Sequence, residues 1–158
     1  MAKRIRTHLM FDGNAEEAMN FYFSLFPKSE VHDVIHYDEG ENKGKLHHAS
    51  FSLGGREFIC IDSPVKHDFG FTPAISIFVD CDSIEELDRV YSALADGGEV
   101  FMPLDNYGFS KKYGWVSDRF GVSWQLNLPK PNTPYNNSTQ LTVFQMQFKN
   151  YGRWKTLA

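Results

Sequence analysis

The 158-residue sequence has little cysteine, no long hydrophobic run and no excess of positive charge. Its two cysteines, Cys60 and Cys81, form no CxxC pair, so neither a disulfide framework nor a zinc or redox motif is expected. No apolar segment approaches the ~20 residues that cross a bilayer, and none follows the basic start as it would in a signal peptide. The net charge of −4 argues against the clustered basic face of a nucleic-acid-binding protein. We therefore expect a cytoplasmic protein with no membrane or nucleic-acid partner.

Glycine is present, but not in the GxGxG pattern that holds a nucleotide-like cofactor at the start of a helix. Gly54-Gly55 join two strand-like stretches, and Gly97-Gly98 follow a helix-like stretch. Neither pair lies between a strand and a helix, where the backbone must approach such a cofactor closely. The sequence therefore disfavours a methyltransferase of the doubly wound kind.

Apolar residues make up 42% of the chain and charged residues 23%, which is typical of a globular protein rather than a disordered one. A chain of this length folds as one domain or as a pair of small modules, and it buries roughly 70% of its unfolded surface. Aromatic residues are abundant at 15%, with 14 Phe, 7 Tyr and 3 Trp. This excess needs an explanation either in the core or in a functional site.

The first half of the chain predicts a strand, a helix and three further strands. Residues 5–11 alternate between two faces. One face carries Ile5, Thr7, Leu9 and Phe11, and the other carries Arg6, His8 and Met10. A helix is expected over residues 15–26, with an N-cap in the turn before it and Pro27 at its end. Strands follow at residues 31–37, 46–53 and 56–61, the last two joined at Gly54-Gly55, so residues 4–62 read β-α-β-β-β.

The second half repeats this order. Residues 73–80 predict a strand, and Ser83 with Glu86 forms the capping box of a helix that reaches residue 96. Strands follow at residues 100–104, 113–118 and 122–128. Residues 72–128 therefore also read β-α-β-β-β, and a recurring order of this kind indicates two copies of one structural unit.

Two such modules resemble the vicinal-oxygen-chelate superfamily, which includes glyoxalase I, fosfomycin-resistance enzymes, extradiol dioxygenases and bleomycin-resistance proteins. More specifically, the sequence resembles the PhnB-like subfamily, whose members are often labelled demethylubiquinone methyltransferases. The segments that carry this resemblance are FDGNAEEA (residues 11–18), Phe21-Tyr22, Phe26-Pro27 and DRFGVSWQL (residues 118–126). The resemblance implies an α+β, glyoxalase-like fold, in which two βαβββ modules form a cupped mixed sheet with helices on its outer face. The paired modules would occupy residues 1–128, followed by a linker and C-terminal arm at 129–158.

Enzymes of this superfamily hold a divalent metal with side chains from the first and last strands of each module, leaving open positions for two substrate oxygens. The resemblance places two of the four ligand positions at Ala74 and Gln125, and the offset between the two modules places a third at Ile59. On the inward face of the first strand, His8 is the nearest candidate for the fourth. Isoleucine and alanine have no ligating atom, which leaves only His8 and Gln125 as metal candidates. We therefore expect no catalytic metal cofactor.

The expected function is the binding of a small, partly apolar molecule in the cup of the sheet. Polar contacts would come from Arg6, His8, Ser76 and Gln125, and apolar walls from Met10, Ile59, Ala74 and Trp115. Whether the protein catalyses a reaction is left open. One alternative is a metal-dependent lyase, isomerase or dioxygenase that uses His8 and Gln125 with further ligands. Others are a protein that sequesters a toxic compound and the methyltransferase of the subfamily label.

Residues 107–115 (YGFSKKYGW) concentrate aromatic rings around Gly108 and Gly114, which would permit motion. The segment is either a lid over the ligand, with Lys111 or Lys112 facing an anionic group, or a hairpin in the interface of a homodimer. The tail residues Phe144 and Phe148 also suggest docking on a second copy of the chain, with a flexible tail as the alternative.

The remaining histidines and cysteines indicate no site. His32 and His36 are expected on one strand face about 13 Å apart, too far to bind one metal by themselves. His47 and His48 are adjacent in a strand, so they point to opposite faces. Cys60 lies on the strand face that should pack on a helix, so its thiol is expected to be inert core.

Overall fold

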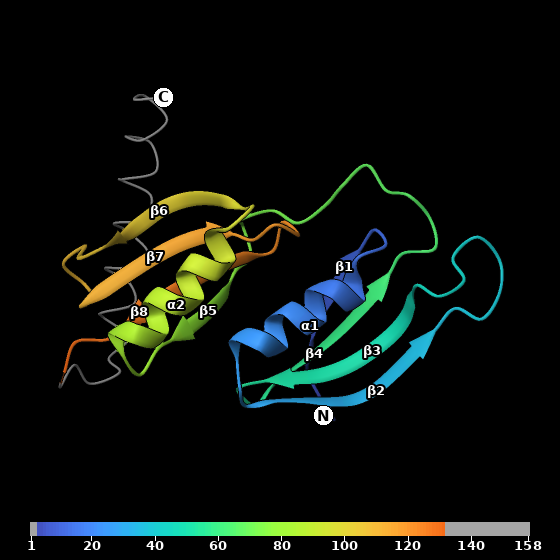
Figure 1. Cartoon of the computed structure of the whole chain (residues 1–158), viewed down its shortest axis with the longest axis horizontal. Coiled ribbons are helices and arrows are strands. Elements are labelled where there is room, and N and C mark those ends of the chain that lie inside the picture. The colour runs from blue at the N-terminus through green and yellow to red at the C-terminus, as the bar shows by residue number, and fades with distance from the viewer. Residues whose placement is uncertain (1–2, 132–158) are drawn as a thin grey trace. The chain divides into compact units, whose positions relative to one another are not determined.

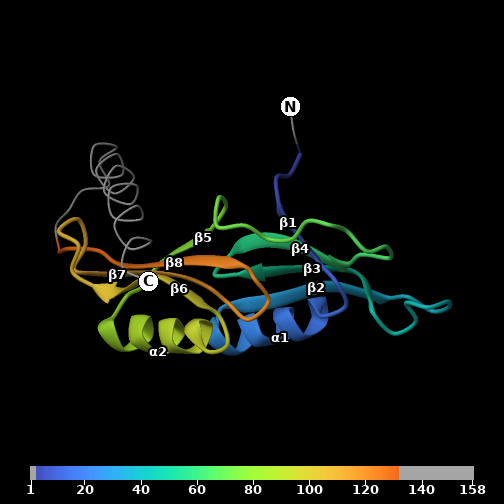
Figure 2. The same cartoon turned by 90° about the horizontal axis from the view of Figure 1, so that it is seen from above.

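In the computed structural model, residues 3–131 are described, and the chain divides into two compact units, one ending at Gly70 and the other beginning at Phe71. In these residues each unit contains one four-stranded mixed sheet and one helix (Figure 1). Each helix lies on one face of its own sheet, as Figure 2 shows. The expected α+β class and the βαβββ order are thus confirmed in both halves. The expected docking of the tail, including Phe144 and Phe148, lies outside the described residues.

The first unit is built from β1 (Thr7–Phe11), α1 (Ala15–Leu25), β2 (Ser29–His36), β3 (Leu46–Leu53) and β4 (Arg56–Asp62). Its strand order is β1-β4-β3-β2, with β1 parallel to β4 and the other pairs antiparallel. The turn between β3 and β4 consists of Gly54 and Gly55, whose φ angles of 56° and 83° are both positive. A two-residue hairpin turn that matches the twist of its strands requires this backbone form, which glycine adopts without strain.

The core of the first unit lies between α1 and one face of the sheet. Leu9, Phe58 and Cys60 are buried on the sheet side, and Ala18 and Tyr22 on the helix side. Met19 is buried on the helix as well, whereas Phe21 is only partly buried. Because strand side chains alternate, the face opposite α1 carries the intervening residues of β1, β3 and β4. We refer to the face opposite the helix in each unit as its far face.

A buried carboxylate at the end of β4 takes over the capping of α1. Asn14 occupies the N-cap position, but its side chain makes no capping hydrogen bond. Instead, Asp62 Oδ1 accepts hydrogen bonds from the backbone N–H groups of Gly13 (2.8 Å) and Ala15 (2.9 Å). Asp62 Oδ2 accepts a third from Leu46 N at 2.9 Å. One side chain therefore joins the turn after β1, the start of α1 and the start of β3.

The second unit is built from β5 (Ile77–Asp80), α2 (Ile84–Ala95), β6 (Glu99–Asp105), β7 (Lys112–Ser117) and β8 (Ser123–Leu128). Its strand order, β5-β8-β7-β6, repeats the arrangement of the first unit, including the parallel pair β5 and β8. The expected capping box is present: Ser83 Oγ accepts a hydrogen bond from Glu86 N (3.1 Å), and the Glu86 carboxylate accepts one from Asp82 N (2.9 Å). No helix within residues 3–131 is long and apolar enough to span a membrane.

Two strands begin at least two residues later than the sequence predicts. The strand expected over residues 73–80 begins at Ile77, because a backbone hydrogen bond from Ile75 N to Thr72 O (3.4 Å) closes a turn with Pro73 inside it. Ala74 lies in this turn and is exposed, so its placement in a strand was wrong. The first strand begins at Thr7 rather than residue 5, and Ile5 is 88% exposed.

Irregular pairing in β2 overturns a second expectation. The register between β2 and β3 shifts between Val31 and Asp33, and again between Ile35 and His36. Such bulges break the strict alternation of side chains. His32 therefore pairs with Glu57 on β4, at 3.4 Å, while His36 pairs with Glu16 on α1, at 2.9 Å. The two histidines do not share one face, as strict alternation had predicted.

Candidate functional site

The far face of the second sheet carries the densest group of polar and aromatic side chains among the predicted site residues. β7 and β8 lie side by side, with Trp115 paired to Gln125 and Ser117 to Ser123. The intervening residues belong to the helix side: Gly114, for example, lies against the ring of Tyr91 on α2. Phe78 of β5 pairs with Gln125 from the other side, so three strands contribute to one row.

Five polar groups on this face form a continuous chain of hydrogen bonds, which we call the polar row. Tyr113 Oη donates to Gln125 Oε1 (2.8 Å), and Gln125 Nε2 donates to Ser76 Oγ (3.1 Å). Ser76 Oγ lies 2.7 Å from Ser123 Oγ, which also accepts a hydrogen bond from Trp115 Nε1 at 2.9 Å. The predicted site residues Ser76, Trp115 and Gln125 are therefore brought together within one unit.

Aromatic rings surround the polar row. At one end, the ring of Tyr113 lies 5.1 to 6.5 Å from the rings of three others, Phe78, Tyr107 and Phe109. At the other end, Phe101 lies 5.0 Å from the ring of Trp115. Phe78 is 48% exposed, whereas Tyr113 is fully buried. The face thus combines apolar surface with a few fixed polar groups, as small-molecule sites generally do.

The segment after β6, expected as a lid or an interface hairpin, is held by several hydrogen bonds. Gly108 N donates to Asn106 Oδ1 (2.9 Å), and Gly108 O accepts from Lys130 Nζ (2.6 Å). The Ser110 hydroxyl lies 2.6 Å from Leu128 O. Burial raises the pKa of the Tyr107 hydroxyl, and the neighbouring Asp105 raises it further, so this phenol stays neutral and donates to Pro103 O (2.8 Å).

Two details of that segment differ from expectation. Gly114 is a strand residue of β7 and provides no hinge, because it makes room for the Tyr91 ring. Lys112 Nζ pairs with Asp88 on α2, so this ammonium group is directed to the helix rather than to a ligand on the far face. Periodicity alone cannot place a lysine at the first position of a strand, where its long side chain can reach either face.

The predicted site residues of the first unit lie on or beside its own far face. His8 pairs with Ile59, and Ile59 pairs with Ser50, so these three form a row across β1, β4 and β3. Met10 is half-buried, His8 is exposed, and Arg6 is exposed in the segment before β1. His8 and Ile59 are therefore neighbours on one sheet, and their role in binding stays a prediction.

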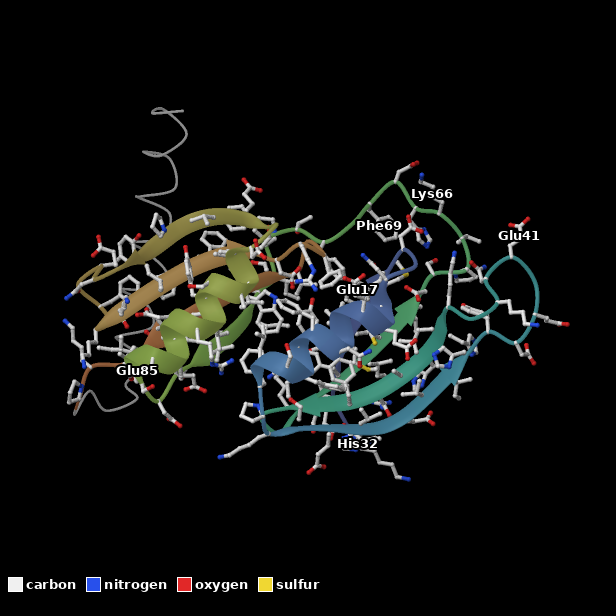
Figure 3. The ribbon with its side chains drawn as sticks, viewed as in Figure 1. Glu17, His32, Glu41, Lys66, Phe69 and Glu85 are labelled. Atoms are coloured by element: carbon white, nitrogen blue, oxygen red, sulfur yellow. The ribbon has the colours of Figure 1, made fainter. Side chains whose placement is uncertain are left out.

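Charged pairs border this face of the first sheet. Glu57 contacts Arg4 at 2.5 Å and His32 at 3.4 Å, and Asp33 contacts His48 at 3.5 Å. Figure 3 shows His32 at the outer side of β2. These side chains are a quarter to a half exposed, so the pairs are screened by solvent and contribute little to stability.

The expected metal ligands do not form a suitable donor set. Ile59 and Ala74 have no donor atom, and the Gln125 oxygen already accepts the Tyr113 hydroxyl proton. Among the described residues, no group of three or more His, Cys, Asp or Glu side chains is placed to hold a metal ion. The residues present therefore do not fit the divalent metal that enzymes of the superfamily use.

The two thiols are buried, as expected for Cys60. Burial, together with the nearby carboxylates of Asp62 and Glu16, raises the pKa of the Cys60 thiol to about 12. Burial also raises the pKa of the Cys81 thiol to about 12, with Glu86 as the next contributor. Because the thiolate is the reactive form, neither cysteine is a nucleophile at neutral pH.

A Ser–His contact that sequence reasoning missed lies in the loop after β4. Ser63 Oγ is 2.9 Å from His67 Nε2 and 2.7 Å from Val65 O. The His67 ring stacks on Phe69, whose side chain extends from the same loop and is 67% exposed (Figure 3). These short-range contacts brace the loop, and no carboxylate contact to His67 completes a catalytic triad within the described residues.

Two members of the candidate site, Phe78 and Ser123, were missed, and Tyr113 had been included only as part of the aromatic segment 107–115. Ser123 and Tyr113 were detectable, because each alternates in sequence with a residue that had been chosen, Gln125 or Trp115. Phe78 takes the place beside Gln125 that His8 takes beside Ile59, as the two parallel strand pairs show. Ala74 had been given that place by resemblance, four residues too early in the chain.

The two βαβββ units define the class of protein. Their order and sheet topology are those of the glyoxalase-like fold. A glyoxylase/bleomycin resistance protein/dioxygenase domain from Frankia has this fold: it covers 82% of this chain and 99% of its own length with a TM-score of 0.56, at 14% identity.

The family follows from closer matches. The model of the family described as 3-demethylubiquinone-9 3-methyltransferase matches residues 3–127, so the chain belongs to this PhnB-like family. A Bacillus cereus protein described as a putative 3-demethylubiquinone-9 3-methyltransferase, PhnB protein, is 54% identical, with 80% of this chain and 99% of that chain covered and a TM-score of 0.77. Protein YjdN of Escherichia coli is 23% identical over 138 residues, which cover 78% of this chain and 93% of the relative.

Proposed function

We propose that this protein binds a small, partly apolar molecule on the far face of the second sheet, without a catalytic metal. The observation that carries the proposal is the polar row, in which five side chains are joined by hydrogen bonds of 2.7 to 3.1 Å between aromatic rings. A row of this kind holds its donors and acceptors in fixed orientations, which favours the binding of a specific ligand over non-specific binding.

The apolar side of the ligand would rest on Phe78. Its ring is 48% exposed although it neighbours the buried Tyr113, so apolar surface is available for a ligand to cover. Burying such surface contributes roughly 25 cal/mol for each Å² removed from water. Gln125 would supply polar contact, because its amide is oriented by Tyr113 and Ser76 and its strand position lies beside Phe78.

A fluorescence and thermal-shift screen tests this proposal. Aromatic ketones, aromatic carboxylates and aliphatic alcohols are compared, and one class is expected to raise the melting temperature and to change the tryptophan emission of the protein. Phe78→Ala should weaken binding at least about fivefold, and its half-exposed position protects the fold. Glu85→Ala, on the exposed side of α2, is the control and should bind like the wild type. Binding that is equal in the wild type and Phe78→Ala would overturn the proposal.

The metal-free part has its own test. Protein purified without added metal is analysed for bound metal, and ligand binding is repeated with a chelator. Binding should be unchanged, because hydrogen bonds with Tyr113 and Ser76 orient the Gln125 amide. A stoichiometric metal that is lost in His8→Ala would favour the alternative of a metal-dependent lyase, isomerase or dioxygenase with ligands beyond His8 and Gln125.

We further propose that the protein is a cytoplasmic homodimer. The support is that the edge strand β2 exposes two large apolar side chains, Val31 (50%) and Ile35 (47%). An exposed edge strand of this kind is a template for pairing with another chain. Light scattering after gel filtration should give twice the 18.2 kDa chain mass. A mass of one chain at micromolar concentration would contradict the dimer.

A further inference from the structure

The directions of the hydrogen bonds in the polar row can be deduced from one end. The Trp115 indole N–H can only donate, so Ser123 Oγ is its acceptor at 2.9 Å. Ser123 is 2% exposed, so its own hydroxyl proton needs an acceptor inside the protein. Ser76 Oγ, 2.7 Å away, is the acceptor that the described residues offer. Ser123 therefore donates to Ser76.

Ser76 consequently accepts twice. One hydrogen bond comes from Ser123 and the other from Gln125 Nε2 at 3.1 Å. The orientation of the Gln125 amide agrees with this, because its oxygen accepts the Tyr113 hydroxyl proton at 2.8 Å. A hydroxyl group has two lone pairs and one proton, so both acceptor sites of Ser76 are used and its proton is left to donate.

We propose that the Ser76 hydroxyl is the donor that recognises the ligand, and that the ligand is an aromatic molecule carrying a carbonyl-type oxygen acceptor. Within the described residues, Ser76 has no acceptor for its proton, and it is half-buried on the same face as Phe78. A hydroxyl that accepts two hydrogen bonds is polarised into a stronger donor. The inference rests on the proposed function and names the ligand class for that site.

The position of Phe78 sets the distance between the two parts of the ligand. Ser76 and Phe78 are two residues apart at the start of β5, which corresponds to about 6–7 Å along an extended chain. A ligand whose ketone, aldehyde or quinone carbonyl group is part of an aromatic ring system or is bonded directly to it spans this distance. Its ring then lies on Phe78 and its carbonyl oxygen reaches Ser76. A ligand with only a donor group would face the Ser76 hydroxyl proton without an acceptor for it and would be rejected.

Two isosteric probes test the inference: acetophenone, which carries the acceptor oxygen, and 2-phenylpropene, in which a CH₂ group replaces that oxygen. Both are titrated into ¹⁵N-labelled protein while the Trp115 indole signal, assigned with Trp115→Phe, is followed. The wild type should bind acetophenone about three- to tenfold more tightly, the range expected for one hydrogen bond. This preference should disappear in Ser76→Ala and persist in Ser76→Thr.

The outcomes separate this inference from the proposed function. If both probes bind equally to the wild type, or if Ser76→Ala keeps the preference, the role of Ser76 is overturned while the binding face stands. If neither probe moves the Trp115 signal at millimolar concentration, the binding face itself fails. Thermal melts of both Ser76 variants show whether a loss of preference reflects the missing hydroxyl or a lost fold.

Discussion

At the scale of single residues, Gly114 is where the chain tolerates no side chain. A Cβ at this position would lie 2.5 Å from Tyr91 Cε2 and 2.9 Å from Leu104 Cδ2. Packed interiors absorb such overlap only by distorting side chains and backbone. We predict that Gly114→Ala lowers the free energy of unfolding by about 1–3 kcal/mol, measured by urea denaturation.

Gly70→Ala is the matched control, because nothing lies within 4 Å of the Cβ it would gain. Its free energy of unfolding should stay close to that of the wild type. Removing the ring should also relieve the overlap, so Gly114→Ala made in a Tyr91→Ala background is expected to cost less than in the wild type. Additive costs would show that the ring is not the cause.

The two cysteines allow a second prediction, on reactivity and pH. Both thiols are buried with pKa values of about 12, against 9.0 for an ordinary thiol. In the native protein at pH 8 neither should react with a thiol reagent within minutes, whereas both should react in urea. Rapid labelling of the folded protein would contradict this.

The sign of the pH effect follows from the same shifts. The folded state binds the thiol protons more tightly than the unfolded state does, so the unfolded state ionises first. The contribution to stability is complete below pH 9 and decreases as the pH rises toward 12. The urea midpoint of unfolding should be lower at pH 10 than at pH 8. This difference should be smaller in a variant in which both cysteines are replaced with alanine.

At the scale of elements, the two helices begin in different ways, and a pair of variants distinguishes them. Ser83 caps α2 with its side chain, whereas Asn14 makes no such bond at α1. We predict that Ser83→Ala costs about 1 kcal/mol of stability and Asn14→Ala only a few tenths. Equal costs in urea denaturation would mean that both side chains cap their helices in solution.

The carboxylate of Asp62 replaces the missing cap and does more, since it also holds β3. It is 2% exposed and accepts three backbone hydrogen bonds. Asp62→Ala leaves these buried N–H groups without an acceptor, so we predict a loss of about 3 kcal/mol or more. Asp12→Ala, on an exposed residue of the same turn, is the control. A cost below about 1 kcal/mol would show that water replaces the carboxylate.

The elements were predictable where their signals are local. Hydrophobic periodicity, the Gly54-Gly55 turn and the Ser83 capping box each act within a few residues, and all three produced the expected structure. Asp62 could not be predicted in its role, because it contacts Leu46 and Gly13, which are distant in sequence. The bulges of β2 were equally hidden, since they depend on pairing with β3.

At the scale of the whole molecule, the family resemblance predicted the fold correctly and the site only in part. Ser76, Trp115 and Gln125 meet because their strands pair within one unit. Phe78 was missed because its place beside Gln125 is a matter of register between β5 and β8, which a resemblance to motifs does not provide. The four residues chosen in the first unit are placed on or beside its far face, and their role stays a prediction.

The family description names methyl transfer, and the fold gives a physical reason to test that activity directly. Gly54-Gly55 join two strands, and Gly97-Gly98 follow α2. Gly98 is explained by packing, because a Cβ there would lie 2.0 Å from Ser117 O. Neither pair forms the strand-to-helix turn that cradles a nucleotide-like cofactor. We predict that millimolar S-adenosylmethionine leaves the melting temperature unchanged, while a ligand of the proposed class raises it. The contrary result would be a rise of several degrees in the melting temperature with S-adenosylmethionine, and the loss of this rise in Phe78→Ala. It would mean that this face binds the methyl donor although the chain lacks the strand-to-helix glycine turn.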